Sequence, residues 1–173
     1  MEQKSIVSKG ESSQTSQVAM LGEMTWLYSM SELHRTWPVG SIHQWLLPAL
    51  LHNQFKIFRR DGRPVGLLTW ARMSKDVETA YVRNTRSLQP KDWVSGDRLW
   101  LLDLIAPFGD GKRIIQHIRH EIFARDVARF LRVRKGDRTI RIVYGHGVDA
   151  LAAARDRSLS PTVELSGDVV LKK

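Results

Sequence analysis

The chain has no cysteine in its 173 residues. This absence excludes disulfide bonds, thiolate metal ligands and a cysteine nucleophile, and it is compatible with a reducing cytoplasm. No apolar run approaches the roughly 20 residues that a membrane-spanning helix needs. Residues 1–17 are polar, rich in Ser and Gln, and lack the apolar segment of a signal peptide, so they are predicted to form a disordered tail. We therefore expect a cytoplasmic protein without stable membrane insertion.

Several motifs that would assign a function are also missing. Ser31 and Ser95 lie outside any Gly-x-Ser-x-Gly sequence, so the nucleophile elbow of a hydrolase is absent. His117 and His120 have no third ligand at a plausible spacing, so no metal site is predicted. There is no helix-turn-helix, RNA-recognition or zinc-finger pattern. The tryptophans, Trp70 among them, are not interleaved with basic residues and are expected in the core or in cleft walls.

Positive charge is abundant. With 42% hydrophobic and 26% charged residues, the chain is predicted to form one domain with its own core. The formal net charge is +9, and residues 112–157 alone carry twelve Lys and Arg against five Asp and Glu, a net +7. This surface would attract DNA, RNA, an anionic membrane or an acidic protein. A solvated face that only keeps the protein in solution is the alternative.

The spacing of apolar residues predicts both helices and strands. Ser41 is a candidate N-cap for the second helix, and Pro48 is expected to kink or shorten it. An Asp-Gly turn joins the strands of the first hairpin. Helices are expected at residues 18–30, 41–53 and 112–130, hairpins at 54–73 and 130–145, and a buried central strand at 100–106.

Two residues are candidates for a reaction centre. Pro38 disfavours a helical conformation at Trp37, so His34 is expected where the first helix gives way to a turn. Asp103 interrupts the apolar run of the central strand, where a carboxylate is costly unless it is paired or functional. A packing histidine and a structural ion pair are the respective alternatives. Together, the two residues could form a base with an orienting carboxylate.

A glycine-containing loop follows the central strand. In PFGDGKR, Gly109 and Gly111 precede a basic helix, and the loop could present backbone N–H groups and a positive helix end to a phosphate. An ordinary turn explains the same two glycines.

The segments LHRTWPV, TWA, DWVSGDRLWLLDLIAPFGD and LRVRKG together resemble the RTX toxin-activating lysine acyltransferases, the hemolysin-activator family. The resemblance covers Leu21 to Gly147 in order and spacing. It implies transfer of a fatty acyl group from acyl carrier protein to internal lysines of an RTX protoxin in the cytoplasm. It also implies a homodimer and a single α+β domain similar to the GCN5-type acetyltransferases, with a mixed, mostly antiparallel sheet flanked by helices. This acyltransferase domain is expected at residues 18–147, followed by a C-terminal extension at 148–173.

The resemblance also implies roles for single residues. His34 and Asp103 match the family's essential histidine and aspartate, and Ser31 matches a serine with a supporting role. No tightly bound cofactor is expected, because acyl-acyl carrier protein, with its 4'-phosphopantetheine thioester, is a co-substrate. The acyl and pantetheine groups are expected at Trp70, Ala106, Gly109 and Gly111, and the acidic carrier protein at Lys112, Arg113 and Arg119.

A small basic nucleic-acid-binding module without enzymatic activity is the competing hypothesis. Its support is the positive charge alone, and it gives a buried Asp103 no role.

Overall fold

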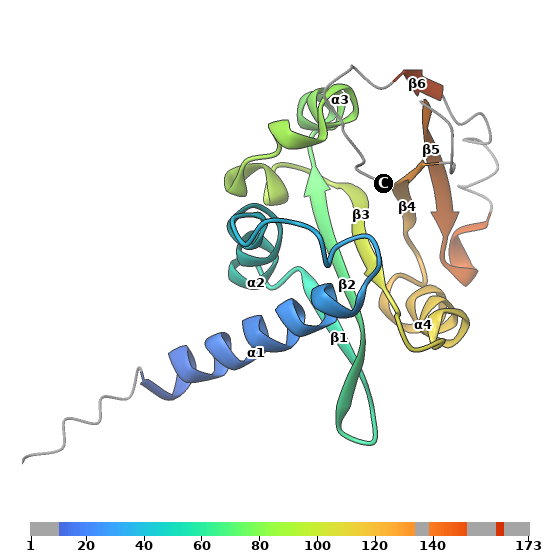
Figure 1. Cartoon of the computed structure of the whole chain (residues 1–173). Helices are drawn as coiled ribbons and strands as arrows, with labels where there is room; N and C mark the ends of the chain where they lie inside the picture. Colours follow the sequence, from blue (N-terminus) through green and yellow to red (C-terminus); the bar gives the residue numbers. More distant parts are fainter. Residues whose placement is uncertain (1–10, 134–138, 152–161, 165–173) are drawn as a thin grey trace, which may run out of the picture.

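The computed structural model describes residues 11–133, 139–151 and 162–164. They form one α+β domain (Figure 1). The strands are β1 (Phe55–Arg60), β2 (Arg63–Met73), β3 (Arg98–Ile105), β4 (Val127–Val133), β5 (Thr139–His146) and β6 (Thr162–Glu164). The α-helices are α1 (Glu11–Met30), α2 (Leu47–Leu51), α3 (Lys75–Arg83) and α4 (Gly111–His117). The π-helical turns are η1 (Ile42–Leu46) and η4 (Ile118–Ile122), and the 3-10 turns are η2 (Thr85–Ser87), η3 (Pro90–Val94) and η5 (Val148–Ala150).

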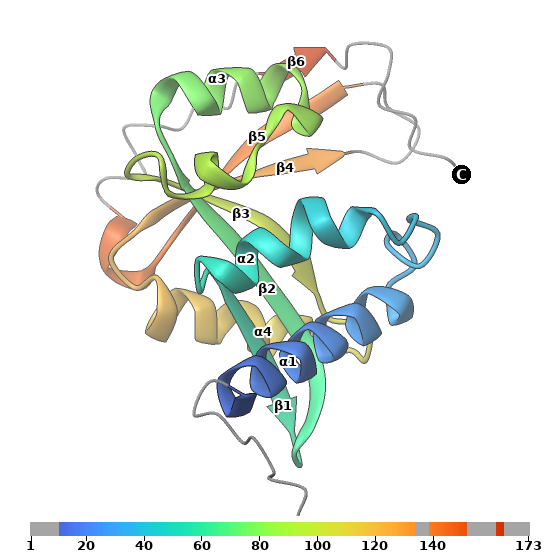
Figure 2. The ribbon, with the colours of Figure 1, turned by 90° about the vertical axis from the view of Figure 1, so that its left-hand side faces the viewer.

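The six strands form one mixed sheet in the order β1-β2-β3-β4-β5-β6. Every neighbouring pair is antiparallel except β3 and β4, which run parallel. Helices α1 and α2 cover one face, and α4 covers the other (Figures 1 and 2). This arrangement confirms the predicted α+β class with a mostly antiparallel sheet, and it is consistent with a GCN5-like fold.

The parallel pair at the centre of the sheet, β3 and β4, is joined over a very short stretch. A single pair of residues, Trp100 and Arg129, is in register between β3 and β4. Glu78 of α3 bridges the two strands, because its carboxylate lies 3.0 Å from Arg129 Nε and accepts a hydrogen bond from Trp100 Nε1 at 3.0 Å. It also pairs with Arg98. The half-sheets β1–β3 and β4–β6 therefore meet at one point and diverge beyond it.

Both predicted hairpins are present. Asp61 and Gly62 join β1 to β2 with φ angles of 52° and 77°. Two positive φ angles are those of a type I′ turn, which Asp-Gly adopts readily and whose twist matches that of the strands. Strands β4 and β5 pair from Val127↔His146 to Val133↔Ile140. The predicted central strand is β3.

Two helix predictions need correction. The predicted helix at 41–53 begins as the π-helical turn η1, and Ser41 itself is in a helical conformation with no side-chain capping bond. Pro48 lies in the first turn of α2, directly after η1, at the point where the π-helical turn gives way to the α-helix. Helix α1 begins at Glu11, so it includes part of the segment assigned to the tail.

The helix predicted at 112–130 is wrong in its second half. Helix α4 ends at His117, the π-helical turn η4 follows, and Phe123 leaves the helical region with φ −127° and ψ 43°. Residues from Val127 onward form β4 instead. Their apolar side chains fit a strand as well as a helix, and pairing with β5 decides between the two.

Candidate active site

His34 lies in the turn that follows α1, as the sequence predicts. The N–H groups of His34 and Arg35 both donate to the Ser31 carbonyl, at 3.2 and 2.9 Å, and Trp37 N–H donates to the His34 carbonyl at 2.9 Å. These bonds reverse the chain ahead of Pro38 and turn the His34 side chain into the domain, where it is 6% exposed.

Asp103, on strand β3 of the sheet, contacts the His34 side chain. His34 Nε2 lies 3.0 Å from Asp103 Oδ1, and Ser31 Oγ lies 2.8 Å from His34 Nδ1. Because a carboxylate only accepts hydrogen bonds, Nε2 carries the proton, and Nδ1 of the neutral imidazole accepts the hydrogen bond from Ser31. The structure thus joins Ser31, His34 and Asp103 in one chain of hydrogen bonds.

Two residues that the sequence analysis did not single out hold Asp103. The Tyr28 hydroxyl donates to Asp103 Oδ2 at 2.6 Å. Thr69, directly opposite on β2, accepts from the Asp103 backbone N–H at 3.2 Å and donates to Oδ2 at 3.4 Å. Burial, and then the negative charge of Asp103, raise the pKa of Tyr28 well above its ordinary value. Tyr28 is therefore a protonated donor at any pH at which the protein would work.

The imidazole of His34 is enclosed by aromatic rings. Its ring centre lies 4.4 Å from that of Tyr28 and 4.6 Å from that of Trp37. Aromatic rings this close to an imidazole attract its protonated form. The site can therefore accommodate a proton on His34 during a reaction, with the charge of Asp103 beside it.

A β-bulge lies next to Asp103. Thr69 pairs with Asp103 and Trp70 pairs with Leu101, so Leu102 has no partner on β2. An extra residue bends the strand locally and increases its twist. On its other edge β3 leaves β4 after the Trp100–Arg129 pair, and the space between the two strands opens.

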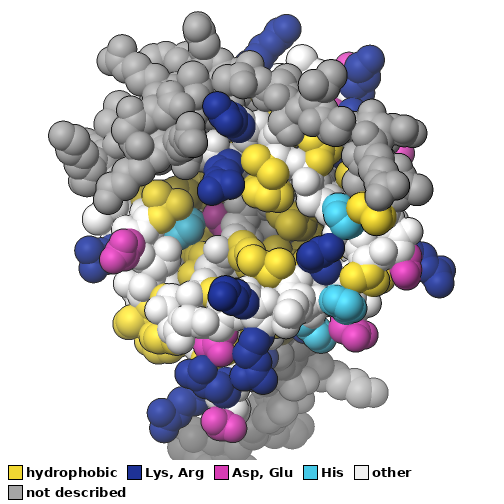
Figure 3. Space-filling model, turned by 90° about the vertical axis from the view of Figure 1, so that its right-hand side faces the viewer, with side chains coloured by type: hydrophobic (Ala, Val, Ile, Leu, Met, Phe, Trp, Pro, Cys, Tyr) yellow, Lys and Arg dark blue, Asp and Glu magenta, His cyan; other side chains and the backbone are white. Residues whose placement is uncertain are grey.

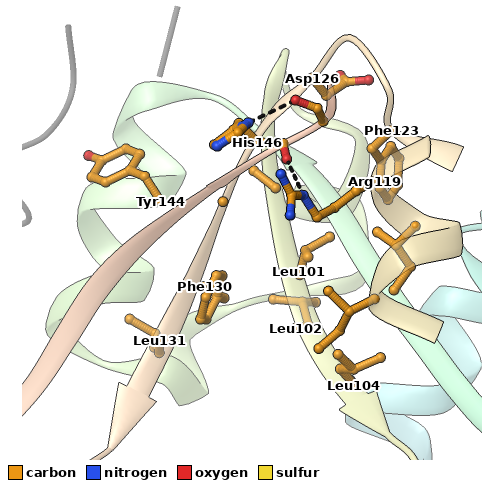
Figure 4. A pocket seen from close by; sticks show the side chains of 15 residues that line it. Leu101, Leu102, Leu104, Arg119, Phe123, Asp126, Phe130, Leu131, Tyr144 and His146 are labelled. Carbon is orange, nitrogen blue, oxygen red and sulfur yellow. Dashed lines mark hydrogen bonds between the residues drawn. The ribbon is translucent and has the colours of Figure 1, made fainter. Parts of the chain in front are cut away.

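This space is a cavity of about 600 Å³ (Figure 4). Leucines of β3 and side chains of α4, η4, β4 and β5 surround it. The lining residues are Leu101, Leu102, Leu104, Ile115, Ile118, Arg119, Phe123, Asp126, Ala128, Phe130, Leu131, Tyr144, Gly145, His146 and Gly147. Seen from outside, it is a hollow with hydrophobic side chains, and Lys and Arg side chains lie around it (Figure 3). Asp103 lies on β3 between Leu102 and Leu104, two of the residues that line the cavity.

A model of the RTX toxin acyltransferase family matches residues 13–145. The chain belongs to this family. The protein-lysine myristoyltransferase RtxC of Kingella kingae is 38% identical over 135 residues, which span 77% of this chain and 80% of the relative. The RTX-I toxin-activating lysine-acyltransferase ApxIC of Actinobacillus pleuropneumoniae is 39% identical over 128 residues, 74% of each chain. The protein-lysine myristoyltransferase HlyC of Escherichia coli is 38% identical over 128 residues, 74% of this chain and 75% of the relative. These matches confirm the resemblance seen in the sequence motifs.

The predicted binding residues of this RTX toxin acyltransferase family member lie in two places. Of the basic residues, Arg119 lines the cavity and donates to the His146 carbonyl at 3.1 Å, while Lys112 and Arg113 are exposed at the start of α4. None of the predicted acyl and pantetheine residues is among those that line the cavity, so their role stays a prediction. Trp70 packs edge-on against Phe123 at 5.2 Å, Ala106 joins the cluster under α4, Gly109 has φ 87°, and Gly111 begins α4.

The described part of the chain has neither a cluster of metal ligands nor a membrane-spanning helix. Within it, no group of three or more His, Cys, Asp or Glu residues could hold a metal ion. None of the helices described there is long and apolar enough to cross a bilayer.

Proposed function

We propose that this chain transfers a fatty acyl group from the thioester of acyl-acyl carrier protein to the ε-amino group of internal lysines of an RTX protoxin. The observation that carries the proposal is the hydrogen-bonded series Ser31–His34–Asp103 beside a large apolar cavity. The relatives' names, lysine acyltransferase and lysine myristoyltransferase, support both the acceptor and the kind of acyl group.

His34 is the base in this proposal. A lysine ammonium is protonated near neutral pH and cannot attack a thioester until it loses a proton. The Ser31 hydroxyl turns its hydrogen away from Nδ1 of His34, and Nδ1 then takes the lysine proton, while Asp103 holds the Nε2–H and stabilises the imidazolium. The free amine then attacks the carbonyl carbon. The new C–N bond forms, the C–S bond breaks, and the second proton of the nitrogen goes to the departing sulfur. An amide and a thiol result, and His34 returns its proton to the solvent.

The transition state also needs a partner for the negative charge that develops on the thioester oxygen. Backbone N–H groups are suitable donors when they are fixed and not already paired. Leu102, directly before Asp103, is the extra residue of the bulge and has no register partner on β2. We therefore assign this segment of β3 as the candidate oxyanion site.

The cavity between β3 and β4 supports an apolar acyl chain as the transferred group. Its walls are mainly leucine, isoleucine and phenylalanine, and removing the chain from water favours binding by about 25 cal/mol for each Å² buried. Lys112, Arg113 and Arg119 are exposed cations on one helical segment beside the cavity, and Arg119 also lines it. They support docking of an acidic carrier protein that delivers the pantetheine arm, with Trp70, Ala106, Gly109 and Gly111 as the neighbouring contacts. Transfer in the cytoplasm and a homodimer complete the proposal.

Intact-mass analysis tests this proposal directly. A fragment of a candidate RTX protoxin is incubated with acyl-acyl carrier protein and either the parent chain or His34→Ala. We expect a mass increase of one acyl group per modified lysine with the parent, and at least a hundredfold slower increase with His34→Ala, because general bases contribute roughly 10²–10⁴-fold. Circular dichroism verifies that the variant is folded. Parent-like transfer by folded His34→Ala would remove His34 from the mechanism.

A further inference from the structure

Tyr28 touches both members of the His34–Asp103 pair. Its hydroxyl donates to Asp103 Oδ2 at 2.6 Å, and its ring centre lies 4.4 Å from that of His34. The side chain is 6% exposed and comes from the last turns of α1, one turn ahead of Ser31. The reaction proposed above assigns this tyrosine no task.

We infer that Tyr28 is a positioning residue of the reaction, which acts through Asp103. The inference rests on the acyl transfer proposed above. The hydroxyl of Tyr28 holds Oδ2, and this leaves Oδ1 facing Nε2 of His34. A carboxylate on a strand can rotate about its side-chain bonds, and a short hydrogen bond on one oxygen fixes the place of the other.

The two oxygens of the Asp103 carboxylate have different partners, and this difference supports the role of Tyr28. Oδ1 interacts with His34 at 3.0 Å, whereas Oδ2 accepts from Tyr28 at 2.6 Å and from Thr69 at the longer distance of 3.4 Å. Tyr28 is thus the stronger of the two donors that hold Oδ2. Hydrogen bonds to an ionised group are shorter and stronger than those between neutral groups.

The same hydrogen bond tunes the charge that His34 experiences. A donor on Oδ2 draws negative charge away from Oδ1, and this weakens the stabilisation of the imidazolium. Another titratable group that senses Asp103 is Tyr81 of α3, whose pKa is raised by burial and then by the Asp103 charge. Tyr81 packs edge-on against Trp100 at 5.3 Å, and its hydroxyl is not hydrogen-bonded to Asp103, whose carboxylate contacts Tyr28, His34 and Thr69.

Tyr28→Phe removes the hydroxyl and keeps the ring beside His34. We expect kcat to fall about tenfold, the effect of losing one hydrogen bond to a charged group, with KM for both substrates within about twofold. The acid limb of the pH–rate profile should move to higher pH, because the unshielded carboxylate favours the imidazolium. A residue that only supported the fold would lower the amount of active protein and leave the pH profile in place.

Tyr81→Phe is the matched control, since it deletes the same group from another buried tyrosine. It should keep the parent kcat and pH profile. A measurement that needs no substrate accompanies the kinetics: the His34 ring resonances, followed by NMR against pH, should titrate at higher pH in Tyr28→Phe than in the parent or in Tyr81→Phe. If folded Tyr28→Phe matches the parent in this titration, the inference is overturned, whether or not the chain transfers acyl groups. If the NMR shift is present and transfer is absent in every protein, the proposed function alone fails.

Discussion

Ser31 is a residue for which the sequence and the structure suggest different roles. The missing Gly-x-Ser-x-Gly motif argues against an acyl-serine intermediate, yet Ser31 Oγ lies 2.8 Å from His34 Nδ1, the placement of a base-activated nucleophile. The same contact also fits a serine that only keeps Nδ1 aimed at the incoming lysine. In the first case transfer needs the serine oxygen, and in the second it does not.

We predict that Ser31→Ala retains transfer at about a tenth of the parent rate, the loss typical of one orienting hydrogen bond. Initial rates of acylation of the protoxin fragment measure this. Ser31→Thr, which keeps a hydroxyl, should recover part of the loss. Complete inactivity of folded Ser31→Ala, together with an acylated form of the parent chain in the mass spectrum, would show an acyl-serine instead.

At the scale of elements, the sequence predicts those parts of the fold that local chemistry decides. The hairpin β1–β2 is predictable because Asp61-Gly62 has one preferred turn, and β3 because its apolar run is too short for a buried helix. The first residues of β4, 127–130, are wrongly assigned to the preceding helix because their conformation depends on pairing with β5, which follows β4 in the chain. For the same reason the sequence does not reveal the cavity, which exists only because β3 and β4 separate.

The same distinction between local signals and long-range contacts applies to the residues of the candidate site. His34 and Asp103 stand out in the sequence from a turn signal and an unusual strand carboxylate, but 69 residues separate them and only the folded sheet shows their contact. Tyr28 lies among the apolar positions of α1 and looks like any core residue there. No sequence signal separates it from a packing tyrosine, because its partner is 75 residues away.

A prediction about the binding of acyl carrier protein concerns the segment formed by α4 and η4. Arg113 and Arg119 are exposed on this segment, and Arg119 also lines the cavity. We expect Arg113→Glu and Arg119→Glu each to weaken binding of acyl carrier protein severalfold, and to flatten the salt dependence of the binding that remains. Titration of labelled carrier protein at several salt concentrations measures both effects. Charge reversal at Arg86, on η2, is the control for a general loss of positive charge. Equal binding by all variants would make the basic segment a solvated face.

At the scale of the whole molecule, ligand binding and folding stability are linked through the cavity. A ligand that binds only the folded chain raises its apparent stability, by about 2.7 kcal/mol at a hundred times Kd. For a chain of this size, this corresponds to a rise of about 5–10 °C in Tm. We expect acyl-acyl carrier protein to raise Tm by this amount, the unacylated carrier by less, and duplex DNA at physiological salt not at all. Stabilisation by DNA alone would favour the nucleic-acid-binding hypothesis.

The single point of contact between β3 and β4 has a consequence for how variants of this protein are interpreted. Where a continuous sheet would share a whole ladder of backbone bonds, Glu78 joins Arg98 and Trp100 on one side to Arg129 on the other. The junction of the two strands that border the cavity therefore depends on the carboxylate of Glu78, which has no part in the proposed reaction. In a mutational scan scored by the proposed acyl transfer, Glu78 would rank beside Asp103 and be mistaken for a carboxylate of the reaction. Only a scan that also records the amount of folded protein would separate Glu78, which holds the two half-sheets together, from Asp103, which is proposed to orient His34.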